Sequence, residues 1–153
     1  MDEAEFTERF LGMMGNQRNR FHPLVWINGT PEIGEGTYIG GFSEVNAKGA
    51  SVRIGARCDI ASFVAINVAD SHRFAIGIDD APTLRDIVIG DEVFIGTHSA
   101  VLGGVVIGHN SVIAAGTIVR PGSIPPFSLV SGNPMTVRPG YYEAAHRAAV
   151  GRA

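Results

Sequence analysis

A six-residue period constrains the fold of this 153-residue chain more than any other feature. Aliphatic residues recur at this interval, the next residue is usually small, and another small or β-branched residue stands four positions after the aliphatic one. The aliphatic positions are Ile33, Ile39, Val45, Ile54, Ile60, Ile66, Ile89, Ile95, Val101, Ile107, Ile113 and Val119. A helix with 3.6 residues per turn would spread such residues around its whole surface, so the period argues against a helix.

The unit is instead that of a short strand followed by a tight corner. The aliphatic side chain points inward, the glycine that often follows lets the backbone turn, and the next small residue, such as Ser99, Ser111 or Ser123, fits the crowded inside of the corner. Three units form a triangular coil, and successive coils stack as parallel strands at about 4.8 Å. The repeat therefore predicts an all-β coil stack.

The two ends of the chain lack this period. Residues 2–14, "DEAEFTERFLGMM", place apolar side chains on one helical face, at Phe6, Phe10, Leu11 and Met14. We expect this helix to cover an end of the stack or to pack on a neighbouring subunit, and a short helix to follow Pro139-Gly140. The chain then divides into a helix and lead-in (1–30), the repeat region (31–138) and a C-terminal tail (139–153).

Composition excludes several classes of protein. A net charge of −3 argues against a nucleic-acid-binding protein. The single cysteine, Cys58, excludes an intrachain disulfide and fits a reducing compartment. No apolar run approaches the roughly 20 residues of a transmembrane helix, and the acidic N-terminus lacks the basic start of a signal peptide. These features predict a cytoplasmic protein without a transmembrane segment.

The period stops at His72 and restarts at Ile89. The segment between them is acidic in its middle and contains a proline, so it predicts a loop over 72–86 that leaves the rigid coil. Loops on rigid scaffolds often carry function. A neutral imidazole can take a proton from a hydroxyl or an amine near neutral pH. The alternative is that His72 only anchors the loop through hydrogen bonds.

The motifs beside this loop resemble those of the hexapeptide-repeat acyltransferases. The resemblance lies in "ADSHRF", in "IVIGDEVFIGTHSAVLGGVVIGHNSVIAAGTIV" and in the closing "SLVSGNPMTV" (128–137). It implies a left-handed parallel β-helix and a homotrimer with active sites between subunits. It also implies transfer of an acetyl group from acetyl-coenzyme A to a hydroxyl of a sugar or polysaccharide precursor, without a metal.

The same resemblance suggests roles for individual residues. His72 matches the general base of the family. The acceptor-binding candidates, with Asn46 ranked first, are Asn46, Asn67, Asp70 and Arg85. The cofactor-binding candidates are Phe94, Thr97, Ala114, Ala115, Arg120 and Arg138. Phe94 stands where the family has a tryptophan, and Arg120 is where nucleotide contacts begin. Arginine suits phosphate recognition.

Three alternative functions remain open at this stage. The first is N-acetylation of a nucleotide-linked amino sugar, which uses the same base and thioester. The second is a γ-type carbonic anhydrase, which needs three histidines on a metal, two of them close in sequence; the nearest pair here is His98 and His109. The third is a non-catalytic assembly protein, because the repeat alone specifies only a scaffold. The acceptor, the preferred acyl chain and the group that stabilises the oxyanion are not specified by these motifs.

Overall fold

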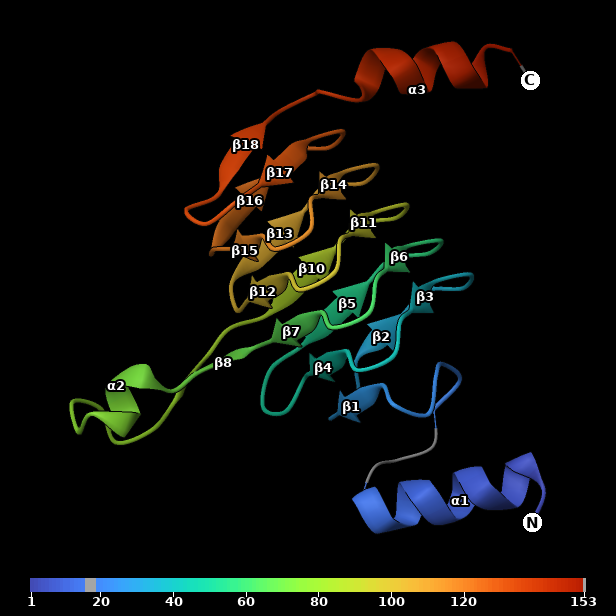
Figure 1. Cartoon of the computed structure of the whole chain (residues 1–153). Coiled ribbons are helices and arrows are strands. Elements are labelled where there is room, and N and C mark those ends of the chain that lie inside the picture. The colour runs from blue at the N-terminus through green and yellow to red at the C-terminus, as the bar shows by residue number, and fades with distance from the viewer. Residues whose placement is uncertain (16–18, 153) are drawn as a thin grey trace.

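The computed structural model describes residues 1–15 and 19–152 and contains the predicted parallel β-helix (Figure 1). The chain winds through three parallel sheets. Sheet A contains β1 (Trp26–Asn28), β4 (Glu44–Asn46), β7 (Ala65–Asn67), β12 (Ala100–Leu102) and β15 (Ile118–Val119). Sheet B contains β2 (Glu32–Ile33), β5 (Val52–Ile54), β10 (Ile87–Ile89), β13 (Val105–Ile107) and β16 (Gly122–Ile124). Sheet C contains β3 (Tyr38–Ile39), β6 (Asp59–Ile60), β11 (Phe94–Ile95), β14 (Val112–Ile113) and β17 (Leu129–Ser131), with β18 (Thr136–Arg138) added antiparallel to β17.

The aliphatic hexad positions form columns inside the stack. In sheet C the column is Ile39, Ile60, Ile95, Ile113 and Val130, paired in register, and each of these residues is fully buried. Burying an aliphatic side chain of this size stabilises the fold by about 1.5–3 kcal/mol. The hydrophobic core therefore runs along the axis of the coil stack.

Small hydroxyl side chains fill the inside of the corners. Ser43 Oγ donates to Ala61 O at 2.9 Å and accepts from Val64 N at 3.1 Å, so this side chain ties its own coil to the backbone of the next one. In the last coil Ser128 takes the inner position and Ser123 is exposed. The prediction that Ser123 is an inner residue is wrong, because this coil is one residue shorter and Ile124 pairs with Ile107.

The hexad glycines allow close stacking rather than turning. A Cβ on Gly96 would lie 2.4 Å from the backbone nitrogen of Ala115 in the next coil, and one on Gly55 would lie 2.6 Å from the backbone nitrogen of Asp91. Neither glycine has a positive φ. The left-handed corner conformation belongs instead to later corner residues. Most of these are not glycine, namely Phe42, Arg57, Phe63, Glu92, His98, Asn110 and Phe127, and Gly36 and Gly116 take the equivalent position in their coils. The prediction that the hexad glycines provide the turn is therefore wrong.

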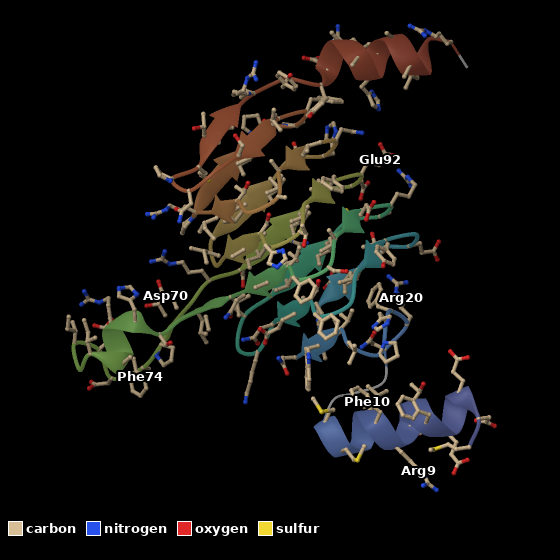
Figure 2. The ribbon with its side chains drawn as sticks, in the orientation of Figure 1. Arg9, Phe10, Arg20, Asp70, Phe74 and Glu92 are labelled. Carbon is tan, nitrogen blue, oxygen red and sulfur yellow. The ribbon has the colours of Figure 1, made fainter. Side chains whose placement is uncertain are left out.

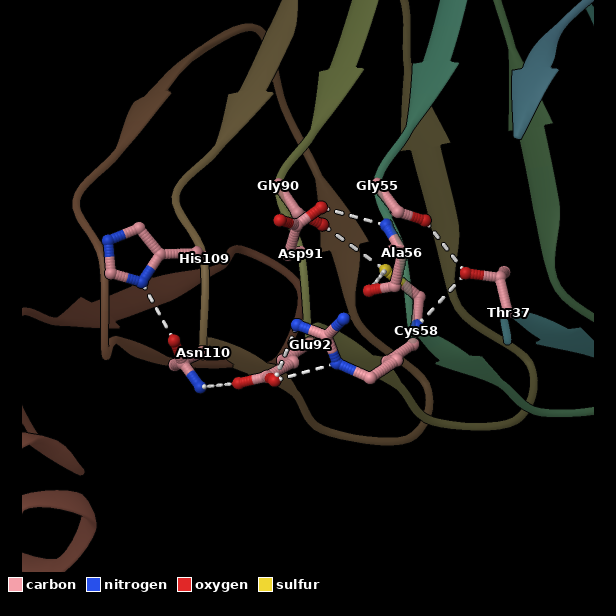
Figure 3. A network of polar contacts seen from close by, with 10 residues as sticks. Thr37, Gly55, Ala56, Cys58, Gly90, Asp91, Glu92, His109 and Asn110 are labelled. Atoms are coloured by element: carbon pink, nitrogen blue, oxygen red, sulfur yellow. Dashed lines mark hydrogen bonds and ion pairs between the residues drawn. The ribbon is translucent and has the colours of Figure 1, made fainter. Parts of the chain in front are cut away.

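The corner residues also form ladders on the surface. The rings of Phe42, Phe63 and His98 stack at centroid distances of 5.0 Å at the corner between sheets C and A. At the corner between sheets B and C, Glu92 accepts from Arg57 Nε at 2.9 Å and from Asn110 Nδ2 at 2.6 Å (Figure 3). These donors lower the pKa of the Glu92 carboxyl, Asn110 contributing most. The ladders align successive corners.

An arm interrupts the stack between β7 and β10, at the corner between sheets A and B (Figure 1). Its stem is the antiparallel pair β8 (Ala69–Asp70) and β9 (Thr83–Leu84), and its tip carries α2 (His72–Ala75). The Arg73 guanidinium holds both carboxylate oxygens of Asp79, at 2.8 and 3.0 Å. The segment expected as a loop is thus a structured arm.

The chain ends lie beyond the stack. Helix α1 (Glu3–Met14) is capped by Asp2, and of its predicted apolar face only Leu11 is buried in the single chain. Helix α3 (Glu143–Val150) forms in the tail. The first strand begins at Trp26, before the expected start at residue 31. Residues 16–18 of the lead-in and residue 153 of the tail lie outside the described residues. Within the described part of the chain, no helix is both long enough and apolar enough to cross a membrane.

The stacking role of the glycines predicts opposite effects for two glycine-to-alanine substitutions. Gly96→Ala should destabilise the protein by about 1–3 kcal/mol, because the new methyl group forces the backbones of two coils apart. Gly12→Ala in α1, where nothing lies within 4 Å of the added carbon, should be neutral or stabilise by up to about 1 kcal/mol. Urea unfolding monitored by circular dichroism measures both. An unchanged midpoint for Gly96→Ala would contradict the stacking role.

Candidate active site

A cavity of about 520 Å³ lies where the arm leaves the coil stack. Its wall combines the arm, the corner after β12 and the residues after β15. The lining residues are Val68, Ala69, Asp70, Ser71, His72, Thr83, Arg85, Leu102, Gly103, Arg120 and Pro121. Three of the acceptor or base candidates, His72, Asp70 and Arg85, are therefore brought together here, and Arg120 joins them.

Asp70 and His72 form a hydrogen-bonded pair where the stem of the arm meets α2; Asp70 is labelled in Figure 2. His72 Nδ1 lies 2.5 Å from Asp70 Oδ1, and the His72 amide donates to the same oxygen at 3.3 Å. The His72 side chain and then its amide lower the pKa of the Asp70 carboxyl. Because an ionised carboxylate only accepts hydrogen bonds, Nδ1 carries the proton of the neutral imidazole and Nε2 keeps the free lone pair. Nε2 is thus available to accept a proton.

The two candidate asparagines hold the start of the arm. Asn46 and Asn67 are register partners at the ends of β4 and β7, and Asn46 Nδ2 donates to Asn67 Oδ1 at 3.1 Å. The same oxygen accepts from Ala69 N at 2.9 Å. Neither asparagine lines the cavity, and the side chain that contacts His72 is Asp70, which the sequence ranked below Asn46.

Two arginines face the same cavity. The Arg85 amide donates to Val68 O at 3.0 Å, which ties this arginine to the other side of the stem. The Arg120 amide donates to Met135 Sδ at 3.4 Å. Over residues 1–15 and 19–152, neither guanidinium forms an ion pair or a hydrogen bond.

Most of the predicted cofactor residues lie on another side of the molecule. Thr97, Ala114 and Ala115 stand at the corner between sheets C and A, and Phe94 is a partly exposed residue of β11 beside it. Thr97 Oγ1 donates to Ser62 O at 2.7 Å. Ala115 is an exposed residue whose amide has no hydrogen-bond partner within the described residues, so the amide can donate to an acceptor atom of a ligand.

The remaining two cofactor candidates, Arg138 and Arg120, lie in different parts of the molecule. Arg138 is in β18 of sheet C, with its guanidinium 4.2 Å from the centroid of the Tyr141 ring. Arg120 follows β15 and lines the cavity of His72. Sheet A lies between the two corners, so one chain does not place Thr97 and Ala115 in the cavity of His72.

The structure also bears on metal binding. Among the described residues, no group of three or more His, Cys, Asp or Glu side chains is placed to hold a metal ion. His72, His98 and His109 lie at three different corners of the coil. The described residues of one chain therefore form no three-histidine site of the carbonic anhydrase kind.

Comparisons with known proteins support the architecture. Residues 86–121 match the family described as bacterial transferase hexapeptide (six repeats). Chloramphenicol acetyltransferase of Escherichia coli is 31% identical over 100 residues, covering 63% of this chain and 47% of that protein. The structure of a galactoside acetyltransferase in complex with coenzyme A has a TM-score of 0.70 at 29% identity, covering 93% of this chain and 74% of the other. A hexapeptide-repeat-containing acetyltransferase of Vibrio cholerae O1 biovar eltor, complexed with acetyl-coenzyme A, has a TM-score of 0.67 at 28% identity, covering 90% and 76%.

These matches confirm the resemblance to hexapeptide-repeat transferases that the sequence indicated. The chain spans less than half the length of the chloramphenicol acetyltransferase that it matches.

Sequence reasoning missed part of the cavity wall, namely Thr83, Leu102, Gly103 and Pro121. The register between coils could have identified three of these residues, Leu102, Gly103 and Pro121. Val119 pairs with Val101, and Leu102 pairs with Asn67, so the residues after Val119 stack above the start of the arm. Aligning the coils by this register places Arg120 and Pro121 beside the arm. Thr83 had no such signal, because it belongs to the non-repeating segment.

The Asp70–His72 pair predicts a shifted titration. In the folded parent, the pKa of the Asp70 carboxyl should lie below the ordinary aspartate value. The ionised pair therefore stabilises the fold at pH values above the ordinary aspartate pKa, and this stabilisation is lost as the pH falls through the folded-state pKa. His72→Ala should move the midpoint upward, because the largest donor is removed while the amide remains. Carbon NMR of labelled aspartate measures the titration. Arg73→Gln, which removes another arm contact, should leave the midpoint in place; no shift in His72→Ala would contradict the pairing.

Proposed function

We propose that this chain is an acetyltransferase that moves an acetyl group from acetyl-coenzyme A to a hydroxyl of a sugar or polysaccharide precursor. The observation that carries the proposal is the Asp70–His72 pair, which leaves His72 Nε2 free at a cavity against a rigid hexapeptide-repeat wall. The similarity to a galactoside acetyltransferase bound to coenzyme A supports the reaction class. The single, unpaired Cys58 is consistent with the cytoplasm, where we place the reaction.

His72 supplies the base for this transfer. Nε2 accepts the proton of the acceptor hydroxyl while the hydroxyl oxygen forms a bond to the acetyl carbonyl carbon. The carbon–sulfur bond then breaks, and the departing thiolate takes the proton from the imidazolium. The products are an acetyl ester and free coenzyme A. Asp70 acts as a positioning residue, because its carboxylate fixes the ring and stabilises the imidazolium that forms transiently.

We assign the binding site of the acetyl donor, acetyl-coenzyme A, to the corner between sheets C and A. There the unpartnered Ala115 amide can donate to the amide-containing arm of coenzyme A, and the partly exposed Phe94 ring offers an apolar cover. The small side chains of Thr97, Ala114 and Ala115 let a ligand approach the backbone. Arg138, on the same sheet, is the candidate for a phosphate contact.

A complete site then requires a second copy of the chain. The base lies at the corner between sheets A and B, whereas the donor residues lie at the corner between sheets C and A. Packing the first corner of one subunit against the second corner of its neighbour brings the two halves together. Repeating this head-to-tail contact around an axis closes a ring, and we propose a homotrimer with three such sites.

N-acetylation of a nucleotide-linked amino sugar is the second candidate, since it uses the same base and donor. The two products differ chemically, because an acetyl ester is cleaved by hydroxylamine at neutral pH and an acetamide is not. Mass spectrometry of the product before and after this treatment separates the two reactions.

The assignment of the base predicts a large loss of rate in His72→Ala. Loss of general-base catalysis should lower kcat by about 10²- to 10⁴-fold, with acetyl-coenzyme A binding retained. His109→Ala is the matched control, because His109 is exposed at the opposite corner, between sheets B and C. Thiol release measures the rate and calorimetry measures binding. A near-parental kcat in His72→Ala would rule out His72 as the base.

The shared site predicts complementation between two nearly inactive variants. His72→Ala removes the base, and Ala115→Trp fills the donor corner; each protein alone should keep only a small fraction of the parental rate. Random reassembly of an equal mixture should restore about a quarter of the sites, because a quarter of the contacts join an intact arm to an intact donor corner. Activity after denaturation and joint refolding tests this. If sedimentation shows that the mixture has reassembled and activity does not return, the base and the donor-binding corner act within one subunit.

A further inference from the structure

The cavity of His72 is positively charged in a chain that is acidic as a whole. Its titratable wall residues are Asp70, His72, Arg85 and Arg120. With the imidazole neutral, the two guanidinium groups outnumber the one carboxylate. The net charge of the whole chain is −3, so the sign of the charge in the cavity is opposite to that of the chain.

The carboxylate of the cavity is already occupied. Asp70 accepts from both the imidazole and the amide of His72, and Arg85 adds only a minor long-range effect on its pKa. Several arginines elsewhere have carboxylate partners: Arg9 pairs with Glu5, Arg57 with Glu92, Arg73 with Asp79 and Arg147 with Glu143. Within the described part of the chain, Arg85 and Arg120 have no such partner.

Backbone geometry directs these two arginines to one place. A Cβ on Gly104 would lie 3.2 Å from Arg85 Cδ and 3.4 Å from Pro121 Cβ, so the bare glycine leaves room for the Arg85 side chain to lie along the corner next to Pro121. Gly104 also has a φ of 90°, which a larger residue would adopt only with strain. The Arg85 amide is fixed to Val68 O across the stem. Arg85 therefore lines the cavity from a supported position, and Arg120 lines the same cavity from the residues after β15.

We propose that the acceptor is anionic, with a carboxylate or phosphate group held by Arg85 and Arg120 beside the hydroxyl that is acetylated. This inference rests on the proposed function, because it takes the cavity of His72 as the acceptor site. Guanidinium groups form paired, charge-assisted hydrogen bonds with both kinds of anion. The phosphates of acetyl-coenzyme A are separated from its thioester by the pantetheine arm. A cation beside the base is thus placed for the acceptor rather than for the nucleotide end of the donor.

Matched acceptors test this inference. Galactose, galacturonic acid and galactose 6-phosphate share a ring and differ at one carbon, being neutral, carboxylated and phosphorylated. Thiol release with acetyl-coenzyme A gives kcat/KM for each, and NMR titration gives binding without turnover. We expect at least one anionic sugar to be bound and used about 10- to 100-fold better than galactose, as for a charge-assisted contact. The better of the two anions distinguishes a carboxylate from a phosphate acceptor.

Arg85→Gln and Arg120→Gln should remove this preference while leaving the KM for acetyl-coenzyme A unchanged. Each should raise the KM for the preferred anionic sugar by about 10-fold or more, with a smaller effect on galactose. Arg147→Gln, in the exposed tail helix, is the control and should not change the preference. Equal use of neutral and anionic sugars by the parent, or a raised KM for acetyl-coenzyme A alone in Arg120→Gln, would overturn the inference.

Failure of the underlying function has a different signature. If the parent does not bind acetyl-coenzyme A by calorimetry and transfers to no sugar, the proposed acetyltransferase itself fails. If it binds acetyl-coenzyme A and acetylates galactose as well as its anionic analogues, only the anionic acceptor is excluded.

Discussion

The distance between successive coils is the constraint on which the rest of the molecule depends. Parallel strands about 4.8 Å apart bring corner backbones so close that a single methyl group at Gly96 would meet the next coil. The same closeness lets one interior hydroxyl, such as that of Ser43, form two hydrogen bonds with the backbone of the next coil. Tight stacking therefore determines where glycine, serine and aliphatic residues occur, and it gives the walls of the stack a fixed geometry.

The arm escapes this constraint in the middle of the stack. Ile60 pairs with Ile95 across it, an interval nearly twice that between Ile95 and Ile113 in an uninterrupted coil, yet the register resumes unchanged. Within the arm the chain pairs mainly with itself, through β8 with β9 and Arg73 with Asp79. The rigid stack thus holds both ends of a segment that the coil repeat does not constrain, an arrangement suited to the proposed acceptor site.

The period of the sequence was sufficient to predict the stack, because each coil repeats the same contacts and every unit supports the same interpretation. It was not sufficient to explain Gly96, whose role depends on the neighbouring coil rather than on its own dihedral angles. The arm at His72 was visible only as a loss of pattern, so its stem and the Asp70 contact could not be derived from periodicity. The family resemblance predicted that Arg120 contacts the nucleotide of coenzyme A. The register of β15 with β12 instead places Arg120 beside the arm.

Exposure of His72, the proposed base, gives the proposed assembly a physical reason. In the single chain the side chains of His72 and Asp70 are 68% and 59% exposed, and water weakens a charged hydrogen bond between such groups. The arm tip also exposes Phe74, Ile76 and Ile78, an apolar surface that the coil of the same chain does not cover. A neighbouring subunit that covers this surface would exclude water from the pair and strengthen its interaction. In the proposed trimer, the contact that completes the donor site is therefore also the one that makes His72 an effective base.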